Sequence, residues 1–484
     1  MRLPLTKIAN SVLIHSTLSL VLIWLAMTAN THAVTANSCS TTDIQTAISN
    51  TGRGGTVTVP AGNCTWNSTL SLTYGITLTG AGVGNTVITS SGGVTLISVV
   101  PDATAIANSE NITITGFTFD GASSSQTLIN IQGASGITGT KPYRYIIIGD
   151  NKFQNTNPSS STLVGAVIQS NADTNGQFRG VIYNNIFDRC NIILRIFSND
   201  DTREWSNTAF NQLPYGNEDN LYFEDNTIMY SSSYSGDNPG WIETGQGGRL
   251  VARYNTWNLA NATTPQEIWD IHGFQNWDGS VNSGQTSTMV VEYYGNTLSN
   301  MGTYRWINHR GSWGMFFDNI LTGSGGNEID LYGMSIPGSC PSDINPTPTN
   351  YNPLVNNTYF FNNTQNGTNV TANMYSTGNP THCSVTENAN WWNYNASCTA
   401  SSCSAGIGRG TAAPTGSCTT GVGYWVASTA TPTASSSVIQ GGSFYKCTST
   451  NTWTPYYTPY TYPHPLRSGQ APPDAPTNLA ATVQ

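Results

Sequence analysis

Two short segments of the chain bring acidic, imidazole and guanidinium side chains together at a spacing of two residues. Asp270 precedes His272 in the segment IWDIHG, and Asn308 precedes Arg310 in the segment RWINHRG. Both segments have the apolar content of short strands, and residues two apart on a strand point to the same face. We therefore expect each polar pair to lie on one face of its strand.

Four such segments end in glycine, which aligns them with one another, at Gly245, Gly273, Gly311 and Gly333. If these glycines stack, His272 lies about one coil from Arg310. Asp270, Asn308 and Asp330 then form a parallel column two residues earlier. Their polarity indicates that both columns face outward.

This set of side chains suits the cleavage of a polysaccharide. In β-elimination of a polyuronate, Arg310 would neutralise the substrate carboxylate and His272 would move a proton near neutral pH. Asp270 and Asp330 would instead act as paired carboxylates in a hydrolase, or bind Ca²⁺. The alternative is an outward polar ladder with no catalytic role.

Aromatic residues accompany these groups. Six of the thirteen tryptophans fall between residues 241 and 313. Rigid rings beside hydrogen-bonding groups are typical of sugar-binding grooves, and packing in the core is the alternative for each tryptophan. Glu243 turns to the opposite face in the glycine alignment, which makes it a weaker candidate. The residues expected to contact a sugar are Trp241, Trp269, Trp306, Asn308, Tyr332 and Glu243.

The elements that must position these side chains form a repeat. Runs of β-branched and aromatic residues recur from Gly75 onward, in GITLTG, NITITGFTF, YIIIGDNKF, VIYNNIF, LYFEDNTI, LVARYNTW, VVEYYGNTL, MFFDNIL and YFFNNT. A second strand-like segment lies between successive runs. Two or three short strands per repeat are typical of a parallel β-helix, so we predict an all-β, right-handed, single-stranded solenoid.

An asparagine recurs at the end of these runs, with spacings of 23 to 44 residues, at Asn151, Asn185, Asn226, Asn255, Asn296, Asn319 and Asn363. Equivalent residues of stacked coils lie ~4.8 Å apart. Each side-chain amide can then donate to the carbonyl of the next. We predict a structural asparagine ladder.

The two ends of the chain differ from this body. Residues 1–33 have the positive, apolar and small-residue order of a secretory signal peptide, which predicts an exported protein with no membrane span after cleavage. Residues 34–365 form the predicted β-helix with an N-terminal capping helix, residues 366–467 an irregular disulfide-tied region, and residues 468–484 a proline-rich tail. Eight cysteines flank the body, and Cys190 is predicted to be a buried free thiol. Sequence neighbours suggest the pairs Cys39–Cys64, Cys340–Cys383, Cys398–Cys403 and Cys418–Cys447.

A short helix pattern after Thr42 leads into GGTVTVPAG, and this beginning, with the later phrases NITITGFTFDG and EDNTI, resembles the pectate-lyase-like right-handed β-helix superfamily. The resemblance covers residues 39–365 and implies the fold. The phrase Trp269–His272 looks like a motif of one pectate lyase family with its middle residues exchanged. The proline-flanked arginine motif of those lyases and the polygalacturonase phrases are not found.

Composition excludes one class of partner. Charged residues are 9% of the chain and the formal net charge is −9, so the basic surface that binds duplex nucleic acid is missing. We expect a secreted, monomeric, carbohydrate-active protein that acts on an extracellular polysaccharide as a lyase or a hydrolase, with Ca²⁺ as the one cofactor considered. The alternative is a non-catalytic surface adhesin or glycan-binding protein.

Overall fold

A computed structural model describes residues 32–124, 127–132, 145–156, 165–170, 179–197, 215–218, 220–236, 239–245, 247–263, 267–273, 287–300, 305–323, 329–331, 333–334, 355–374, 382–427 and 441–468. The predicted signal peptide and the proline-rich tail fall almost wholly outside these residues. No helix among them is long and apolar enough to cross a membrane.

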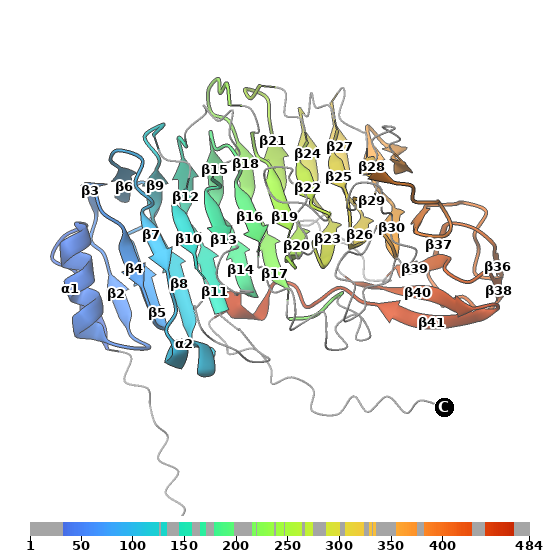
Figure 1. Cartoon of the computed structure of the whole chain (residues 1–484), viewed down its shortest axis with the longest axis horizontal. Helices are drawn as coiled ribbons and strands as arrows, with labels where there is room; N and C mark the ends of the chain where they lie inside the picture. The colour runs from blue at the N-terminus through green and yellow to red at the C-terminus, as the bar shows by residue number, and fades with distance from the viewer. Residues whose placement is uncertain are drawn as a thin grey trace, which may run out of the picture.

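The body is a parallel β-helix, as predicted, in which three sheets run along a common axis (Figure 1). Their described strands pair in parallel, except for the last pair of sheet B, which is antiparallel. Sheet A holds the strands expected from the repeated runs, and its twelve described strands are β1 (Ala33–Thr35), β2 (Thr56–Thr58), β5 (Ile76–Thr79), β8 (Asn111–Thr115), β11 (Tyr145–Gly149), β14 (Arg179–Tyr183), β17 (Leu221–Glu224), β20 (Arg249–Arg253), β23 (Val290–Tyr294), β26 (Trp313–Phe317), β30 (Thr358–Phe361) and β35 (Trp391–Asn393).

Sheet B follows sheet A in each coil, after the asparagine turn. Its eleven described strands are β3 (Gly62–Trp66), β6 (Thr86–Ser90), β9 (Thr118–Asp120), β12 (Lys152–Gln154), β15 (Ile186–Asp188), β18 (Thr227–Met229), β21 (Thr256–Asn258), β24 (Thr297–Ser299), β27 (Ile320–Thr322), β31 (Thr364–Gln365) and β32 (Thr368–Asn369).

Sheet C contains the second strand-like segments of the sequence repeat. Its ten described strands are β4 (Leu70–Leu72), β7 (Ile97–Val99), β10 (Ile129–Ile131), β13 (Ile168–Ser170), β16 (Leu194–Phe197), β19 (Ile242–Gly245), β22 (Trp269–Ile271), β25 (Ile307–His309), β28 (Ile329–Leu331) and β33 (Asn373–Met374).

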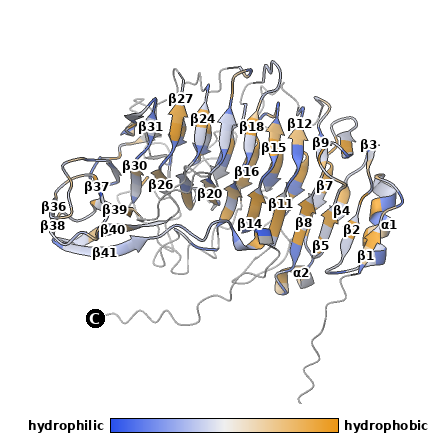
Figure 2. Cartoon of the chain, turned by 180° about the vertical axis from the view of Figure 1, so that it is seen from behind, coloured by the Kyte–Doolittle hydropathy of each residue, from blue (hydrophilic) through white to orange (hydrophobic). Residues whose placement is uncertain are grey.

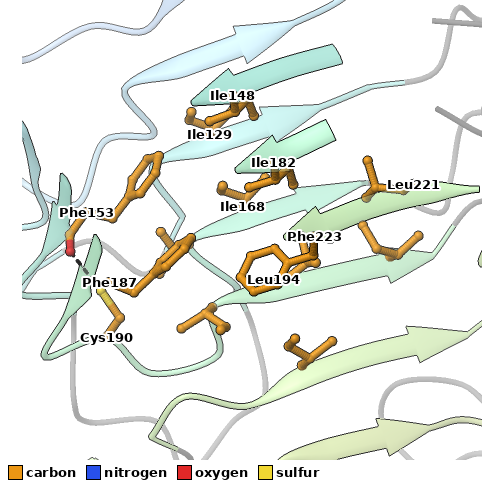
Figure 3. Close-up of a cluster of buried hydrophobic side chains, with 14 of the residues drawn as sticks. Ile129, Ile148, Phe153, Ile168, Ile182, Phe187, Cys190, Leu194, Leu221 and Phe223 are labelled. Atoms are coloured by element: carbon orange, nitrogen blue, oxygen red, sulfur yellow. Dashed lines mark hydrogen bonds between the residues drawn. The ribbon is translucent and has the colours of Figure 1, made fainter. Parts of the chain in front are cut away.

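The interior between the three sheets is apolar. Many residues of the body strands are hydrophobic (Figure 2). One column of stacked rings has centroids 5.1–5.5 Å apart and consists of Phe117, Phe119, Phe153 and Phe187. The Cys190 thiol lies at the edge of this core, where its sulfur is 3.5 Å from the carbonyl oxygen of Phe153 (Figure 3). Cys190 is free and buried, as predicted.

The predicted asparagine ladder is present. Each side-chain amide, from Asn151 to Asn319, donates to the next carbonyl oxygen over 2.9–3.2 Å. The same nitrogen also donates to a backbone carbonyl of sheet A, and the backbone N–H of each asparagine donates to the next side chain. The residue before each asparagine has a positive φ, as at Asp225 and Tyr254, so the amide fills a tight corner that leaves backbone groups to be satisfied.

The N-terminal end is covered by the predicted helix, α1 (Thr41–Thr51), which buries Ile44, Ala47 and Ile48 against the first coil. The Ser40 side chain caps it by accepting from the Asp43 N–H. A second short helix, α2 (Ala103–Ala107), lies in one turn. The cap shields a coil end that would otherwise expose sheet edges.

The region after residue 365 differs from the expectation of an irregular segment. Parallel pairing continues through β33 and β35, so the predicted boundary at residue 365 falls within the coiled body. A four-stranded sheet follows, formed by β37 (Ile407–Gly410), β39 (Gly423–Ala427), β40 (Gly442–Ser449) and β41 (Thr452–Tyr457). Two small pairs complete the described strands, β29 (Gly333–Met334) with β34 (His382–Cys383), and β36 (Ser402–Cys403) with β38 (Ser417–Cys418).

This C-terminal region covers the outer face of sheet A. Residues that point outward from sheet A share one apolar cluster with Trp425, Phe444 and Tyr457. The chain then runs back along the sheet to the 3₁₀ turn η1 (Pro465–Ser468), beside β11 and β14 (Figure 1). Arg253 donates to the carbonyl oxygens of Tyr460 and Thr461 over 2.7 and 2.8 Å.

Three of the predicted disulfides are present, Cys39–Cys64, Cys398–Cys403 and Cys418–Cys447. Cys383 is also disulfide-bonded, and its predicted partner Cys340 lies outside the described residues. Several disulfide bonds in one chain are typical of proteins that fold in an oxidising compartment.

Candidate active site on sheet C

A column of polar side chains runs across the outer face of sheet C. The strand register pairs Arg195 with Glu243, Glu243 with Asp270, and Asp270 with Asn308, and the backbone pairing continues to Asp330. Alternation along β22 sends Trp269 and Ile271 into the core and leaves Asp270 on the other face. The side chains of the column are nevertheless buried, with Glu243 at 0% and Arg195 at 6% exposed.

The glycine alignment was wrong by one residue at β19 and correct beyond it. Glu243, rather than Ile242, stands opposite Asp270, and Thr244 stands opposite Ile271. A register that matched Gly245 to Gly273 would have turned Ile242 out of the core, since a slip of one residue moves every side chain to the other face. Glu243 therefore shares the face of Asp270, contrary to the expectation that it points away.

Asp270 is the centre of the contacts in this column. The Arg310 Nη2 group contacts both carboxylate oxygens of Asp270, and His272 Nε2 lies 3.0 Å from Asp270 Oδ2. The Phe197 ring meets the His272 ring edge-on, with centroids 5.4 Å apart. Arg195 Nε donates to the Glu243 Oε2 atom on the neighbouring coil. The structure thus brings together the three residues proposed for catalysis from the sequence, Asp270, His272 and Arg310.

Glu267 joins this group and was missed by the sequence interpretation. It lies three residues before Asp270, is 5% exposed, and its Oε2 atom is 3.4 Å from Arg305 Nε. The available signal was the pair of acids at a spacing of three residues across the start of β22. That signal was weak, because only the bend at Ile268 turns Glu267 to the side of Asp270.

The pKa values of Glu267 and Asp270 are shifted in opposite directions. Burial, together with the charge of Asp270, raises the pKa of Glu267 well above its ordinary value. Burial also opposes ionisation of Asp270, but its contacts with the Arg310 guanidinium and the His272 ring outweigh burial and hold the pKa of Asp270 below its ordinary value. Glu267 is therefore the acid of the pair that holds its proton more tightly, and Asp270 is the one that ionises more readily.

The predicted sugar-stacking tryptophans are core residues. Trp269 and Trp306 are 0% exposed and lie 5.4 Å apart inside the main core, while Trp241 packs with Ala166 and Ile192 in a small separate cluster. None of the three offers an open ring face for a sugar. Tyr332 and the side chain of Asp330 lie outside the described residues.

The second histidine of the segment has no part in this group. His309 points inward, where its ring lies 5.5 Å from the Phe316 ring. Burial lowers the pKa of His309 to about 3, so the ring is neutral.

Asp270 is the one described side chain of the expected Ca²⁺ site, and its contacts do not suit a Ca²⁺ ligand. Asp270 already has a guanidinium group on both of its oxygens. Ligand atoms of Glu243, Asp270 and His272 do lie within 4.8 Å of one another. Arg195 and Arg310 oppose a divalent ion there, because each neutralises one of the two carboxylates that would have to attract it.

A polar cavity of about 410 Å³ lies elsewhere, beside sheet B, and is lined by Asp120, Asn155 and Arg189 among others. Asp120 accepts hydrogen bonds from Gln154 and Asn155, and Arg189 donates to Ser232 and Asn155. Asp120 and Arg189, the acidic and basic residues that line this cavity, both form hydrogen bonds between neighbouring coils. We therefore place the candidate site on sheet C.

No family model and no curated protein matches this chain. Similar solved structures include the catalytic domain of a GH87 alpha-1,3-glucanase in complex with nigerose, with 12% identity and a TM-score of 0.35 over 75% of this chain and 68% of that chain. A variant of a GH87 alpha-1,3-glucanase catalytic domain in complex with tetrasaccharides has 14% identity and a TM-score of 0.27 over the same shares. Similarity at this level supports no inference about activity.

Proposed function

We propose that this chain is a polysaccharide-cleaving glycoside hydrolase in which Glu267 donates a proton to the leaving oxygen and Asp270 acts as the ionised carboxylate. The observation that carries the proposal is the placement of two buried acids three residues apart, each in contact with its own arginine, on one face of the β-helix.

Hydrolysis of a glycosidic bond needs this division of labour. One carboxyl group must be protonated to release the leaving sugar, and the other must be ionised to activate water or to bond to the anomeric carbon. The opposite pKa shifts of Glu267 and Asp270 support that assignment. Arg310 and His272 act as positioning residues here, since both hold Asp270 in its charged form.

The same contacts favour hydrolysis over the β-elimination considered from the sequence. An eliminating enzyme must offer a cation to the carboxylate of its uronate substrate. Arg310, the residue expected in that role, is committed to Asp270. Arg195 and Arg305 also contact acids of the site.

The proposal is tested with residues 34–484 on a panel of neutral glycans and polyuronates, by reducing-end release and by absorbance at 235 nm. We expect reducing ends without unsaturated product. Glu267→Gln and Asp270→Asn should each lower kcat by ~10²-fold or more, the usual contribution of general acid–base catalysis. Asp150→Asn, the same exchange at an exposed turn of sheet A, is the control.

The pH profile separates the two roles. Activity should fall on the acidic side as Asp270 gains a proton and on the alkaline side as Glu267 loses one. Glu267→Gln should remove the alkaline limb. Unsaturated product would instead establish a lyase, and glycan binding without cleavage of any substrate would support the non-catalytic alternative.

A further inference from the structure

Asp270 is flanked on both neighbouring coils by acceptor groups on the same face of sheet C. Glu243 stands opposite Asp270 on one side and Asn308 on the other. Neighbouring strands of a sheet lie ~4.8 Å apart, so the three side chains form consecutive rungs. Glu243 is 0% exposed and Asn308 is 5% exposed.

Each flanking residue has an oxygen atom that is not used by the fold. Glu243 Oε1 and Asn308 Oδ1 have no hydrogen-bond partner within the part of the chain that the structure describes, and neither does Arg195 Nη2 beside Glu243. An unsatisfied buried polar atom costs the fold ~1–3 kcal/mol. Two buried acceptors and one buried donor near the Asp270 carboxylate thus lack a partner among the described residues of the fold. Their number in one place indicates a site for a ligand.

We propose that Glu243, Asn308 and Arg195 form a subsite for the hydroxyl groups of a neutral sugar residue beside the scissile bond. This inference rests on the hydrolase function proposed above and names its substrate class, a polysaccharide of uncharged sugars. A hydroxyl group can donate to one unpaired oxygen and accept from the unpaired guanidinium nitrogen, so two hydroxyl groups are needed to satisfy both oxygens.

The charges at the site disfavour a uronate in the same place. A carboxylate has no proton to give to Glu243 Oε1 or Asn308 Oδ1. It would also lie against the negative charges of Glu243 and Asp270, whose arginine partners are already in contact with them. The subsite thus favours a neutral sugar over a uronate, because a uronate carboxylate would leave the acceptor oxygens of Glu243 and Asn308 unpaired.

Asn308→Leu isolates this role, because it removes the open oxygen in a side chain of similar volume. Activity on neutral glycans should fall about tenfold in kcat/KM, as expected for one lost hydrogen bond to a buried group. The free energy of unfolding should stay unchanged or rise, since no bond of the fold depends on that oxygen. A clear loss of stability in Asn308→Leu would assign Asn308 to the fold and overturn its part in the subsite.

The substrate panel gives the second test, with wild-type protein on neutral and acidic polysaccharides, each with EDTA, Ca²⁺ or Mn²⁺. Cleavage of neutral glycans that is unaffected by EDTA supports the subsite. Hydrolysis confined to polyuronates would overturn the subsite and leave the hydrolase assignment intact. Activity lost in EDTA and restored by a metal ion would show that Glu243, Asp270 and His272 hold a cation instead.

If no glycan is cleaved, the hydrolase assignment fails and binding decides the subsite. Calorimetric titration of neutral oligosaccharides should then show binding that Asn308→Leu weakens about tenfold. Absence of binding in both proteins would overturn the subsite as well.

Discussion

The replacement of one ladder asparagine tests whether the ladder stabilises the β-helix. The Asn255 side chain takes part in four hydrogen bonds, and we consider Asn255→Ala. Its Nδ2 atom donates to Phe223 O over 2.8 Å and to Asn296 Oδ1 over 3.0 Å. Its Oδ1 atom accepts from the backbone nitrogen of Asn226 over 2.9 Å and from Asn226 Nδ2 over 3.0 Å.

The expected cost follows from the groups that lose every partner among these contacts. Asn226 Nδ2 keeps its bond to Ile182 O, and Asn296 Oδ1 keeps the backbone donor of residue 255. The Asn226 N–H is left without its partner, whereas Phe223 lies within β17 and its carbonyl loses only the bond from Asn255 Nδ2. At ~1–3 kcal/mol for an unsatisfied buried group, Asn255→Ala should lower the free energy of unfolding by about 2 kcal/mol.

Urea and thermal unfolding followed by circular dichroism measure this loss. Asn67→Ala, at an exposed position with the same chemical change, is the matched control and should shift stability by less than ~0.5 kcal/mol. If Asn255→Ala behaves like the control, the ladder bonds do not stabilise the coil and the reasoning is wrong.

Two further predictions concern buried titratable groups. Burial raises the pKa of Glu292 from 4.5 to about 6, although Tyr457 donates to it. The folded chain therefore holds this proton more tightly than the unfolded chain, so the resulting stability is full below the unfolded value and is lost as the pH rises through about 6. Glu292→Gln should remove about 2 kcal/mol of the stability change between pH 4.5 and 7, measured as urea midpoints at several pH values, and an unchanged pH dependence would contradict this. Burial raises the pKa of the Cys190 thiol to about 12, so a thiol reagent should not label Cys190 in native protein and should label it in guanidinium chloride, with rapid native labelling as the contrary result.

The repetitive features of the fold could be predicted from the sequence because each is set within a few residues. The strand runs that became β5, β8 and β11 show the period of two that defines a strand. The recurring asparagine predicted its own ladder, because any stacked solenoid brings equivalent residues to one strand spacing. The helix cap and the close cysteine pairs are likewise local patterns.

The candidate site could be predicted only in part. Asp270, His272 and Arg310 were found because they lie on two segments whose relative register was correct. Glu243 was placed on the wrong face because a glycine match outweighed the burial of Ile242. The tryptophans were assigned to the surface, since a ring suits a sugar groove and a core equally well until the alternation is known.

The sequence by itself determined the coil, its ladder and its cap, because strand period, turn residues and helix capping are properties of neighbouring residues. The tertiary structure decided which side chains meet across coils. A shift of one residue at β19 joined Glu243 to Asp270, and the bend at Ile268 brought Glu267 to the same group. It also decided that the C-terminal chain covers sheet A, where Arg467 donates to Glu224 over 3.0 Å across 243 residues of sequence. Contacts of that kind depend on the packing of the whole chain, which no local pattern encodes.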